Sequence, residues 1–353
     1  MEKLKLKFKP IQFKNNKIII IDQTKLPNKL VYETIEDYKK MGKAIKELKV
    51  RGAPLIGVSA AYGIVVGLNK LNVKTFEAFE KEFNKIYRYL SETRPTAVNL
   101  FYALDRMKRV FYENKTKSIN EIKKILRVEA DNIFKEDLEL SYRIGKNGSK
   151  LIKNGDIILT HCNAGGLATS GLGTALSVMF VAHSQGKRFK IFADETRPLL
   201  QGARLTTWEL VKYGIDTTLI TDNTAAFAIK NKGISKIIVG ADRIAANGDT
   251  ANKIGTFNLG ILAKYYKIPL YIAAPSTTFD FSIKNGSMIP IEERHSNEVV
   301  NFRKQKVAPD KVQVYSPAFD VTPHNLISGF ITEYGVLKPP YSLSFKKIKL
   351  NNK

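Results

Sequence analysis

The chain has 353 residues, a length that favours two domains over a single core. Its one cysteine excludes an internal disulfide and a cysteine-built zinc site, and no apolar run reaches about 18 residues, so we expect no membrane-spanning segment and no membrane partner. The formal charge of +24 comes from lysines spread along the chain without arginine-rich runs, so we expect solvated basic faces and no nucleic-acid partner.

The N-terminal part is predicted to combine a small sheet with helices. Residues 4–8 (LKLKF) and 17–21 (KIIII) suggest strands of an antiparallel hairpin or meander. Helical spacing follows from residue 34, breaks at 50–54 (VRGAP), and resumes as an apolar, Ala-rich helix over 57–68. Three further segments are amphipathic at helical spacing, the second with Pro95 as a helix start: 75–90, 97–112 and 119–144.

The polar, glycine-rich segment 145–156 marks the predicted domain boundary, which divides the chain into residues 1–145 and 146–353. Strands and helices alternate after it, as is typical of a parallel sheet covered on both faces. Six strands are predicted, near 157–161, 189–193, 217–221, 236–240, 269–273 and 312–315. We therefore predict an α/β fold: a doubly wound, Rossmann-like C-terminal sheet and a smaller N-terminal α+β domain with a short antiparallel sheet and helices.

The most informative stretch is DIILTHCNAGGLATSGLGTALSV, residues 156–178. It predicts a buried strand over 156–161, a glycine-bearing loop, and a helix over 169–185. Such a loop directs backbone N–H groups and the positive helix end at a ligand, which favours phosphate. Cys162 lies in this loop, where the pKa of a thiol can be lowered.

Topology brings a second residue to the same place. In a doubly wound sheet with strand order 3-2-1-4-5-6, strands one and four are neighbours, and ligands bind at their carboxyl ends. Cys162 follows strand one, and Asp242 follows strand four. We therefore expect these two side chains to face one crevice.

Other site types fit the sequence poorly. The glycines of the loop do not have the G-x-G-x-x-G spacing, and no G-x-x-x-x-G-K-[ST] motif occurs, so we expect neither a dinucleotide nor a nucleoside triphosphate. The four histidines lack metal-ligand spacing, so we expect no metal. Taken alone, Cys162 is more often a small buried hydrophobe, Asp242 could cap a helix, Arg51 could be a turn residue and Lys253 could be solvated.

Several longer motifs resemble the methylthioribose-1-phosphate isomerases, within the wider family of translation initiation factor 2B alpha, beta and delta subunits. The resemblance runs from about Leu30 to Leu337, with the motifs in the same order. They are RGAPLIGVSAAYG (51–63), RPTAVNLFYALDRM (94–107), LTHCNAGGLATSGLGTAL (159–176), ADETRPLLQGARLTTWEL (193–210), GADRIAANGDTANKIGT (240–256), IPIEER (289–294) and SPAFDVTP (316–323). The polar loops match as well as the apolar framework.

The resemblance implies an aldose–ketose isomerisation in methionine salvage, from 5-methylthioribose 1-phosphate to 5-methylthioribulose 1-phosphate, without cofactor or metal. It implies that Asp242 donates the proton to the ring oxygen and that Cys162 assists the hydrogen transfer or stabilises the transition state. It also implies a phosphorylated pentose as ligand, a homodimer and these substrate-binding residues: Arg51, Gly52, Ala53, Arg94, Gln201, Asn252 and Lys253. The N-terminus lacks the apolar region of a secretory signal, so we expect a cytoplasmic protein.

Two alternatives stay open beside this interpretation. One is a sister isomerase acting on 5-deoxyribose 1-phosphate or ribose 1,5-bisphosphate, which differs in the surroundings of C5. The other is a non-catalytic initiation-factor 2B-like subunit. Two positions depart from the pattern that the resemblance leads us to expect: Gly166 in place of alanine, and Tyr334 in place of arginine.

Overall fold

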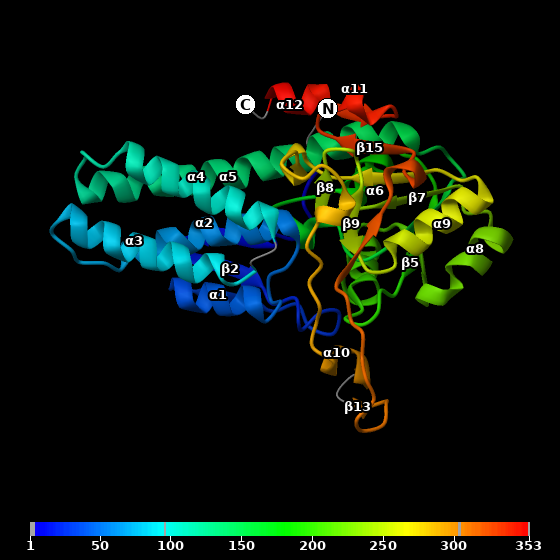
Figure 1. Cartoon of the computed structure of the whole chain (residues 1–353), viewed down its shortest axis with the longest axis horizontal. Helices are drawn as coiled ribbons and strands as arrows, with labels where there is room; N and C mark the ends of the chain where they lie inside the picture. Colours follow the sequence, from blue (N-terminus) through cyan, green and yellow to red (C-terminus); the bar gives the residue numbers. More distant parts are fainter. Residues whose placement is uncertain (1–3, 95–96, 303–304, 352–353) are drawn as a thin grey trace.

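The computed structural model describes residues 4–94, 97–302 and 305–351. A helical N-terminal part lies beside an α/β C-terminal part, and an arm that carries α10 and β13 extends away from both (Figure 1). Within the described residues, no helix is long and apolar enough to cross a membrane. The mixed α/β fold with a predominantly parallel C-terminal sheet and a small antiparallel N-terminal sheet confirms the predicted fold class.

The N-terminal sheet is a three-stranded antiparallel meander of β1 (Ile11–Lys14), β2 (Lys17–Ile21) and β3 (Tyr32–Ile35). Asn15 and Asn16 form the tight turn between the first two strands, with φ of 52° and 57°. The predicted meander is confirmed, but the strand expected at residues 4–8 is wrong. Phe8 packs on Trp208 of the C-terminal part instead, with ring centroids 5.0 Å apart.

The N-terminal helices begin close to where the sequence predicts them. They are α1 (Tyr38–Lys46), α2 (Ala53–Asn69), α3 (Phe76–Ser91), α4 (Val98–Glu113) and α5 (Ile119–Gly148). The first starts four residues later than the helical spacing does, because residues 32–35 pair with β2 and Asp37 caps the helix by accepting from Lys40 N–H. The helix start predicted at Pro95 lies outside the described residues.

α5 connects the two parts of the molecule (Figure 1). A capping box of Ser118 and Glu121 begins it. Near its C-terminal end Ile144 joins the same hydrophobic cluster as Val178 of α6 (Ala175–Ser184). The helix runs through residue 145, and the division of the chain into domains at that residue stays a prediction.

The C-terminal sheet has seven strands in the order β16-β15-β10-β7-β4-β5-β6. Their bounds are β4 (Ile157–Thr160), β5 (Lys190–Asp194), β6 (Asp216–Ile220), β7 (Lys236–Val239), β10 (Leu270–Ala273), β15 (Gly329–Thr332) and β16 (Gly335–Leu337). The first six strands along the chain follow the predicted order 3-2-1-4-5-6, with β16 added antiparallel at the edge. The sixth strand is 329–332, so the strand predicted at 312–315 is wrong; Val312 and Tyr315 are exposed, and this apolar alternation has no core to face.

Both faces of the sheet are covered. Successive residues such as Ile237 and Ile238 point to opposite clusters, as the strand geometry requires. One cluster joins the sheet to α5, α6 and the segment that leads into α7 (Thr207–Lys212). The other joins it to α8 (Ala225–Lys232), α9 (Thr256–Tyr266), α11 (Tyr341–Ser344) and α12 (Lys346–Asn351).

A smaller sheet extends from the carboxyl end of β7, with the order β11-β8-β9-β14. Its strands are β8 (Arg243–Ala245), β9 (Thr250–Lys253), β11 (Phe279–Asp280) and β14 (Phe319–Thr322). The arm comprises residues 294–302 and 305–316, beyond the bridge between Glu293 and Pro317. It contains α10 (Asn297–Val300), β12 (Asn301–Phe302) and β13 (Gln305–Lys306). Through β9, the small sheet places Asn252 and Lys253 in the same cleft as Cys162, which follows β4.

Candidate active site

A cleft opens at the carboxyl ends of β4 and β7, between the two parts of the molecule. Cys162 and Asp242 both line it, so the expectation that they face one crevice is confirmed. Every residue named from the sequence lines the same cleft: Cys162, Asp242, Arg51, Gly52, Ala53, Arg94, Gln201, Asn252 and Lys253. Their chemical roles are a separate question.

The loop after β4 holds Cys162 in the left-handed region, with φ of 58°. A non-glycine residue rarely adopts this conformation, so the surroundings must impose it. The backbone N–H of Cys162 donates to Thr196 Oγ1 at 2.8 Å, and its carbonyl accepts from Thr206 Oγ1 at 2.5 Å. Two hydroxyl groups from other segments thus fix the backbone that presents the thiol.

The helix predicted over 169–185 is shorter than expected. It begins at Ala175, and the residues before it form a loop. Thr169 Oγ1 accepts from the N–H groups of Gly171 and Gly173, at 3.1 and 2.9 Å, and these bonds compete with helix formation. The glycine-bearing loop is therefore longer, and it wraps the floor of the cleft.

The loop after β7 and the hairpin of β8 and β9 supply the opposite wall. The backbone N–H of Asp242 donates to the carbonyl of Ala251, which fixes the start of this hairpin. Asn252 donates to Thr256 Oγ1 at 2.9 Å, and the Lys253 ammonium lies 4.8 Å from the centre of the Phe319 ring. The acid and two polar residues thus enter the cleft from the open end of one hairpin.

The N-terminal part contributes cations. Gly52 precedes α2 with φ of 94°, and a Cβ there would lie 2.5 Å from Ala168, so only glycine fits. Arg51 donates to both oxygens of Asn163, at 2.5 and 2.7 Å. Arg94 pairs with Glu292 at 3.4 Å.

Two of the predicted binding residues carry buried polar atoms that have no hydrogen-bond partner among the described residues: Arg94 Nε and Gln201 Oε1. Buried polar atoms are usually paired, because burial without a partner costs about 1–3 kcal/mol. Both side chains line the cleft, which is where a polar ligand could satisfy them.

The cleft changes the acidity of its two central groups. Burial raises the pKa of the Cys162 thiol, although Arg51 and Lys253 act in the opposite direction. Burial also raises the pKa of the Asp242 carboxyl, against the lowering effects of Lys253, Arg94 and Arg51. The thiol is therefore protonated at neutral pH, and the carboxyl holds its proton more readily than an exposed aspartate does.

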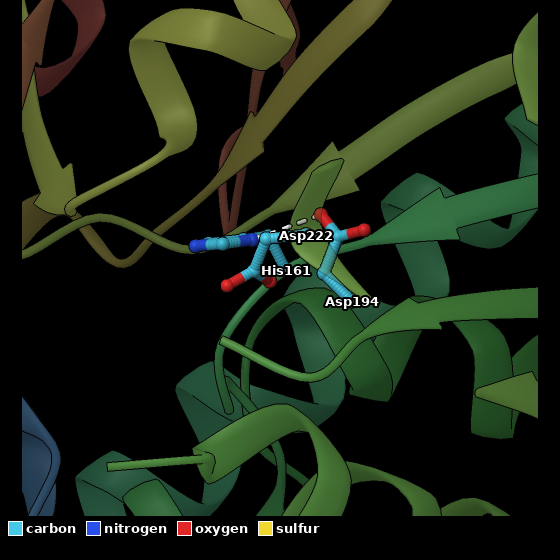
Figure 2. Close-up of side chains that lie close together, drawn as sticks. All are labelled: His161, Asp194 and Asp222. Atoms are coloured by element: carbon cyan, nitrogen blue, oxygen red, sulfur yellow. Dashed lines mark hydrogen bonds and ion pairs between the residues drawn. The ribbon is translucent and has the colours of Figure 1, made fainter. Parts of the chain in front are cut away.

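His161, Asp194 and Asp222 lie close together where β4, β5 and β6 end (Figure 2). His161 Nδ1 bonds Asp194 Oδ2 at 2.9 Å, and its Nε2 bonds the carbonyl of Ile254 at 2.9 Å. Asp222 accepts from the backbone N–H groups of Thr196 and Arg197. Both ring nitrogens and both Asp222 oxygens are engaged within the protein, whereas the buried Asp194 Oδ1 has no partner among the described residues. These hydrogen bonds join the loops that follow β4, β5 and β6.

Sequence reasoning missed four polar residues of the site: Asn163, Glu209, Glu292 and Arg294. Three of them line the cleft, and Glu209 lies behind Asn163. Arg294 pairs with Glu292 at 2.8 Å and also with Glu298. All four fall within the motifs quoted above, but their spacing does not indicate which of them reach the cleft.

Gly166, one of the two departures, has a local reason. A Cβ at this position would lie 2.3 Å from the carbonyl oxygen of Gly171, so alanine would require the loop to shift. At the second departure, the Arg143 guanidinium lies 5.7 Å from the centre of the Tyr334 ring.

The chain resembles known proteins over nearly its whole length. A model of the initiation factor 2 subunit family matches residues 49–339. The chain is 52% identical to the methylthioribose-1-phosphate isomerase of Geotalea uraniireducens (strain Rf4) over 343 residues, which cover 97% of this chain and 99% of the relative. It is 50% identical over 345 residues to the protein of the same name from Thermosipho melanesiensis, covering 98% of this chain and 99% of that relative.

Solved structures give the same picture. The 5-methylthioribose 1-phosphate isomerase of Pyrococcus horikoshii OT3 superposes with a TM-score of 0.92 at 45% identity, covering 98% of this chain and 96% of that chain. A structure described as the delta subunit of translation initiation factor eIF-2B from A. fulgidus superposes with a TM-score of 0.86 at 41% identity, covering 97% of this chain and 99% of that chain.

Proposed function

The chain belongs to the initiation factor 2 subunit family, and from this premise we propose that it isomerises 5-methylthioribose 1-phosphate to 5-methylthioribulose 1-phosphate in methionine salvage. The observation that carries the proposal is the meeting of Cys162 and Asp242 in one cation-lined cleft. Relatives at about 50% identity over nearly the whole chain bear the name of this enzyme.

The reaction explains why such a cleft is needed. The anomeric carbon of the substrate carries phosphate, so the sugar cannot open spontaneously to an aldehyde. The ring oxygen must receive a proton as its bond to C1 breaks. Hydrogen then moves from C2 to C1, as a proton through an enediol-like species or as a hydride, and the C2 hydroxyl loses its proton as the ketone forms.

We assign the proton donor to Asp242 and its partner role to Cys162. The raised pKa of Asp242 supports this assignment, because a general acid must hold its proton until the ring oxygen takes it. The Cys162 thiol faces the same cleft and is held by a fixed backbone. It would assist the hydrogen transfer or stabilise the charge that develops on the substrate.

The remaining predicted residues would bind the sugar phosphate. Arg51 and Arg94 offer planar guanidinium groups suited to phosphate. Gln201 would bond sugar hydroxyls through its buried oxygen, and Asn252 with Lys253 would close the opposite side. No step in this account requires a cofactor or a metal.

The surroundings of Asp242 support a methylthio group at C5. A recess adjoins the cleft and shares Asp242 with it, and its apolar lining includes Ile56, Ala97, Ile289 and Pro290. C5 is two bonds from the ring oxygen that Asp242 would protonate, so a C5 substituent must lie within a few ångströms of this acid. Of the two arginines that line the recess, Arg94 is assigned to the phosphate at C1, and Arg243 pairs with Asp280 at 3.7 Å. A second phosphate at C5 would therefore meet a cation whose charge an acidic neighbour already partly neutralises.

The decisive experiment is an isomerase assay on purified protein with three substrates in parallel: 5-methylthioribose 1-phosphate, 5-deoxyribose 1-phosphate and ribose 1,5-bisphosphate, each with a chelator present. We expect fast ketose formation from the methylthio compound, unaffected by the chelator. Turnover of another sugar phosphate alone would keep the chemistry and overturn the substrate. The absence of turnover with all three would favour a non-catalytic initiation-factor subunit.

We further propose that the protein is a cytoplasmic homodimer. The arm exposes Val307, Val312 and Tyr315, at 61%, 47% and 83% of their surface, as a protein–protein interface would. The free thiol of Cys162 is compatible with a reducing compartment. Light scattering coupled to size exclusion tests the dimer: a monomer mass at micromolar concentration would contradict it.

A further inference from the structure

Glu209 is a fully buried carboxylate behind the cleft. It lies on α7, away from the residues assigned to the reaction. Its oxygens accept from Asn163 Nδ2 at 2.8 Å, from the backbone N–H of Gly166 at 2.6 Å and from that of Leu167 at 3.3 Å. All three donors belong to the loop that follows Cys162, so one side chain holds the first part of this loop, residues 163–167.

Asn163 passes this constraint on to Arg51. Its amide nitrogen donates to Glu209 and to Thr206 Oγ1, so its amide oxygen must face the other way. That oxygen accepts from Arg51 Nη1, and the Asn163 carbonyl accepts from Arg51 Nη2. The Glu209 carboxylate therefore determines that the amide oxygen of Asn163, and not its amide nitrogen, faces the Arg51 guanidinium.

The close approach of Glu209 is built into the sequence of the loop. A Cβ at Gly165 would lie 2.4 Å from a Glu209 oxygen, a distance that real side chains do not reach. Gly165 is thus the residue that lets the carboxylate reach the N–H groups beyond it. A side chain at this position would displace the Glu209 carboxylate from the Gly166 and Leu167 N–H groups.

We propose that Glu209 is a positioning residue, which fixes the Asn163 amide so that Arg51 is held in the orientation that binds the substrate phosphate. The inference rests on the proposed function, because it assumes that Arg51 binds the sugar phosphate. Glu209 touches no substrate in this proposal and acts only through Asn163.

Asp137 provides a matched control. It is also a buried carboxylate, and it also accepts a backbone N–H of the same region, from Ser170 at 2.5 Å. It lies on α5 and has no hydrogen bond to Asn163 or Arg51 among those found in the described part of the chain. Asp137→Asn thus removes a buried carboxyl group beside the same loop, keeps one oxygen that can accept from Ser170, and leaves the Arg51 connection untouched.

The test compares Glu209→Gln, Asp137→Asn, Arg51→Ala and the double variant Arg51→Ala/Glu209→Gln in the full chain. In Glu209→Gln, the glutamine has one acceptor oxygen and an NH2 group that would face a donor, so the Asn163 amide is no longer fixed. We therefore expect the KM of this variant to rise about tenfold, with kcat within about twofold of the parent. Asp137→Asn is expected to lower Tm with KM unchanged. In the double variant, Glu209→Gln should raise KM no further than Arg51→Ala alone, because the two changes remove one interaction.

Two results would show that Glu209 is only a structural residue. One is a KM of the double variant that equals the product of the two single effects. The other is an unchanged KM in Glu209→Gln together with a Tm loss like that of Asp137→Asn. If Glu209→Gln does not fold, Asn163→Ala removes the connection and leaves the carboxylate bonded to Gly166 and Leu167; the same KM rise is expected. A crystal structure of the variant without substrate gives an independent readout: Arg51 displaced from its place beside residue 163 supports the proposal, and an unmoved Arg51 overturns it. That readout remains decisive even if the parent protein turns over no sugar phosphate and the proposed function itself fails.

Discussion

Two buried regions of this protein are built from opposite kinds of residues. The centre of the helical N-terminal part is apolar, with Phe111 of α4 stacked on Phe83 at 4.0 Å between ring centroids and packed against Phe76 and Phe79. The cleft at the ends of β4 and β7 gathers a thiol, two acids, four cations and several amides instead. The first region arises from α1–α5 packed together with the small antiparallel sheet, whereas the second draws on loops from both halves of the chain.

The contrast separates what stabilises the protein from what makes it act. Burying apolar surface stabilises at about 25 cal/mol per Å², whereas burying charged or unpaired polar groups costs free energy. Arg94 Nε and Gln201 Oε1 are buried in the cleft without partners among the described residues. Because burial of the polar cleft residues costs free energy and burial of the apolar core lowers it, changes in the two regions should have opposite consequences for stability and activity.

The largest expected effect lies in the cleft. Asp242→Asn and Cys162→Ser should each lower kcat about 10²–10⁴-fold, because the proposed mechanism assigns the proton donor to Asp242 and its partner role to Cys162. Neither side chain stabilises the fold by apolar packing, so thermal melts and far-UV circular dichroism should match the parent. Near-parental kcat in both variants would contradict their assignment.

The converse change is Phe111→Ala in the helical core. Removing this fully buried ring should lower the free energy of unfolding by about 3–5 kcal/mol, through lost transfer energy and the cavity left behind. Urea titration measures the loss. At a temperature where the variant is folded, kcat per folded molecule should be unchanged; a parallel loss of kcat would show that the two regions are coupled.

Ile289 sharpens the comparison, because it is an apolar residue on the cleft side, 7% exposed in the recess beside Asp242. Ile289→Ala should lower kcat/KM about tenfold for 5-methylthioribose 1-phosphate and less for 5-deoxyribose 1-phosphate, since the lost contact would be to the methylthio group. Ile261→Ala on the exposed face of α9 serves as the control. Equal losses for both substrates would remove Ile289 from the C5 subsite.

Asp249 is the opposite case, a polar residue in the connection between β8 and β9 that does not line the cleft and that we expect to stabilise only. Burial alone would raise its pKa, but hydrogen bonds from Asn247, Gly286 and His324 lower the pKa of Asp249 to about 2. Its side chain is 16% exposed. The ionised form is therefore favoured by folding, and the resulting stability of about 1–2 kcal/mol is present above the unfolded pKa of about 4 and lost as pH falls toward 2.

Urea titrations of Asp249→Asn and the parent at pH 7, 5, 4 and 3 measure this difference. It should be constant from pH 7 to 5 and shrink below pH 4, with kcat at pH 7 unchanged. A difference that grows on acidification would reverse the sign of the linkage.

The sequence alone determined much of the fold, because its strongest signals are local. Apolar spacing located α2, α3 and α4, and short β-branched runs between helices located five strands of the parallel sheet. Strand order followed from the rules of doubly wound sheets, and it brought Cys162 and Asp242 together across 80 positions of the chain. The motif resemblance added the cations of the N-terminal part.

Tertiary structure decided the rest, because it depends on which surfaces meet. Residues 4–8 and 312–315 alternate like strands, but a strand forms only where a neighbour offers its hydrogen bonds. Thr169 kept the next residues out of α6 through side-chain bonds that propensity does not register. The connection from Glu209 through Asn163 to Arg51 joins three segments whose contact exists only after α7 packs against the loop of β4. The role of a buried carboxylate depends on the hydrogen-bond donors that folding brings to it, and only the tertiary structure shows which donors these are.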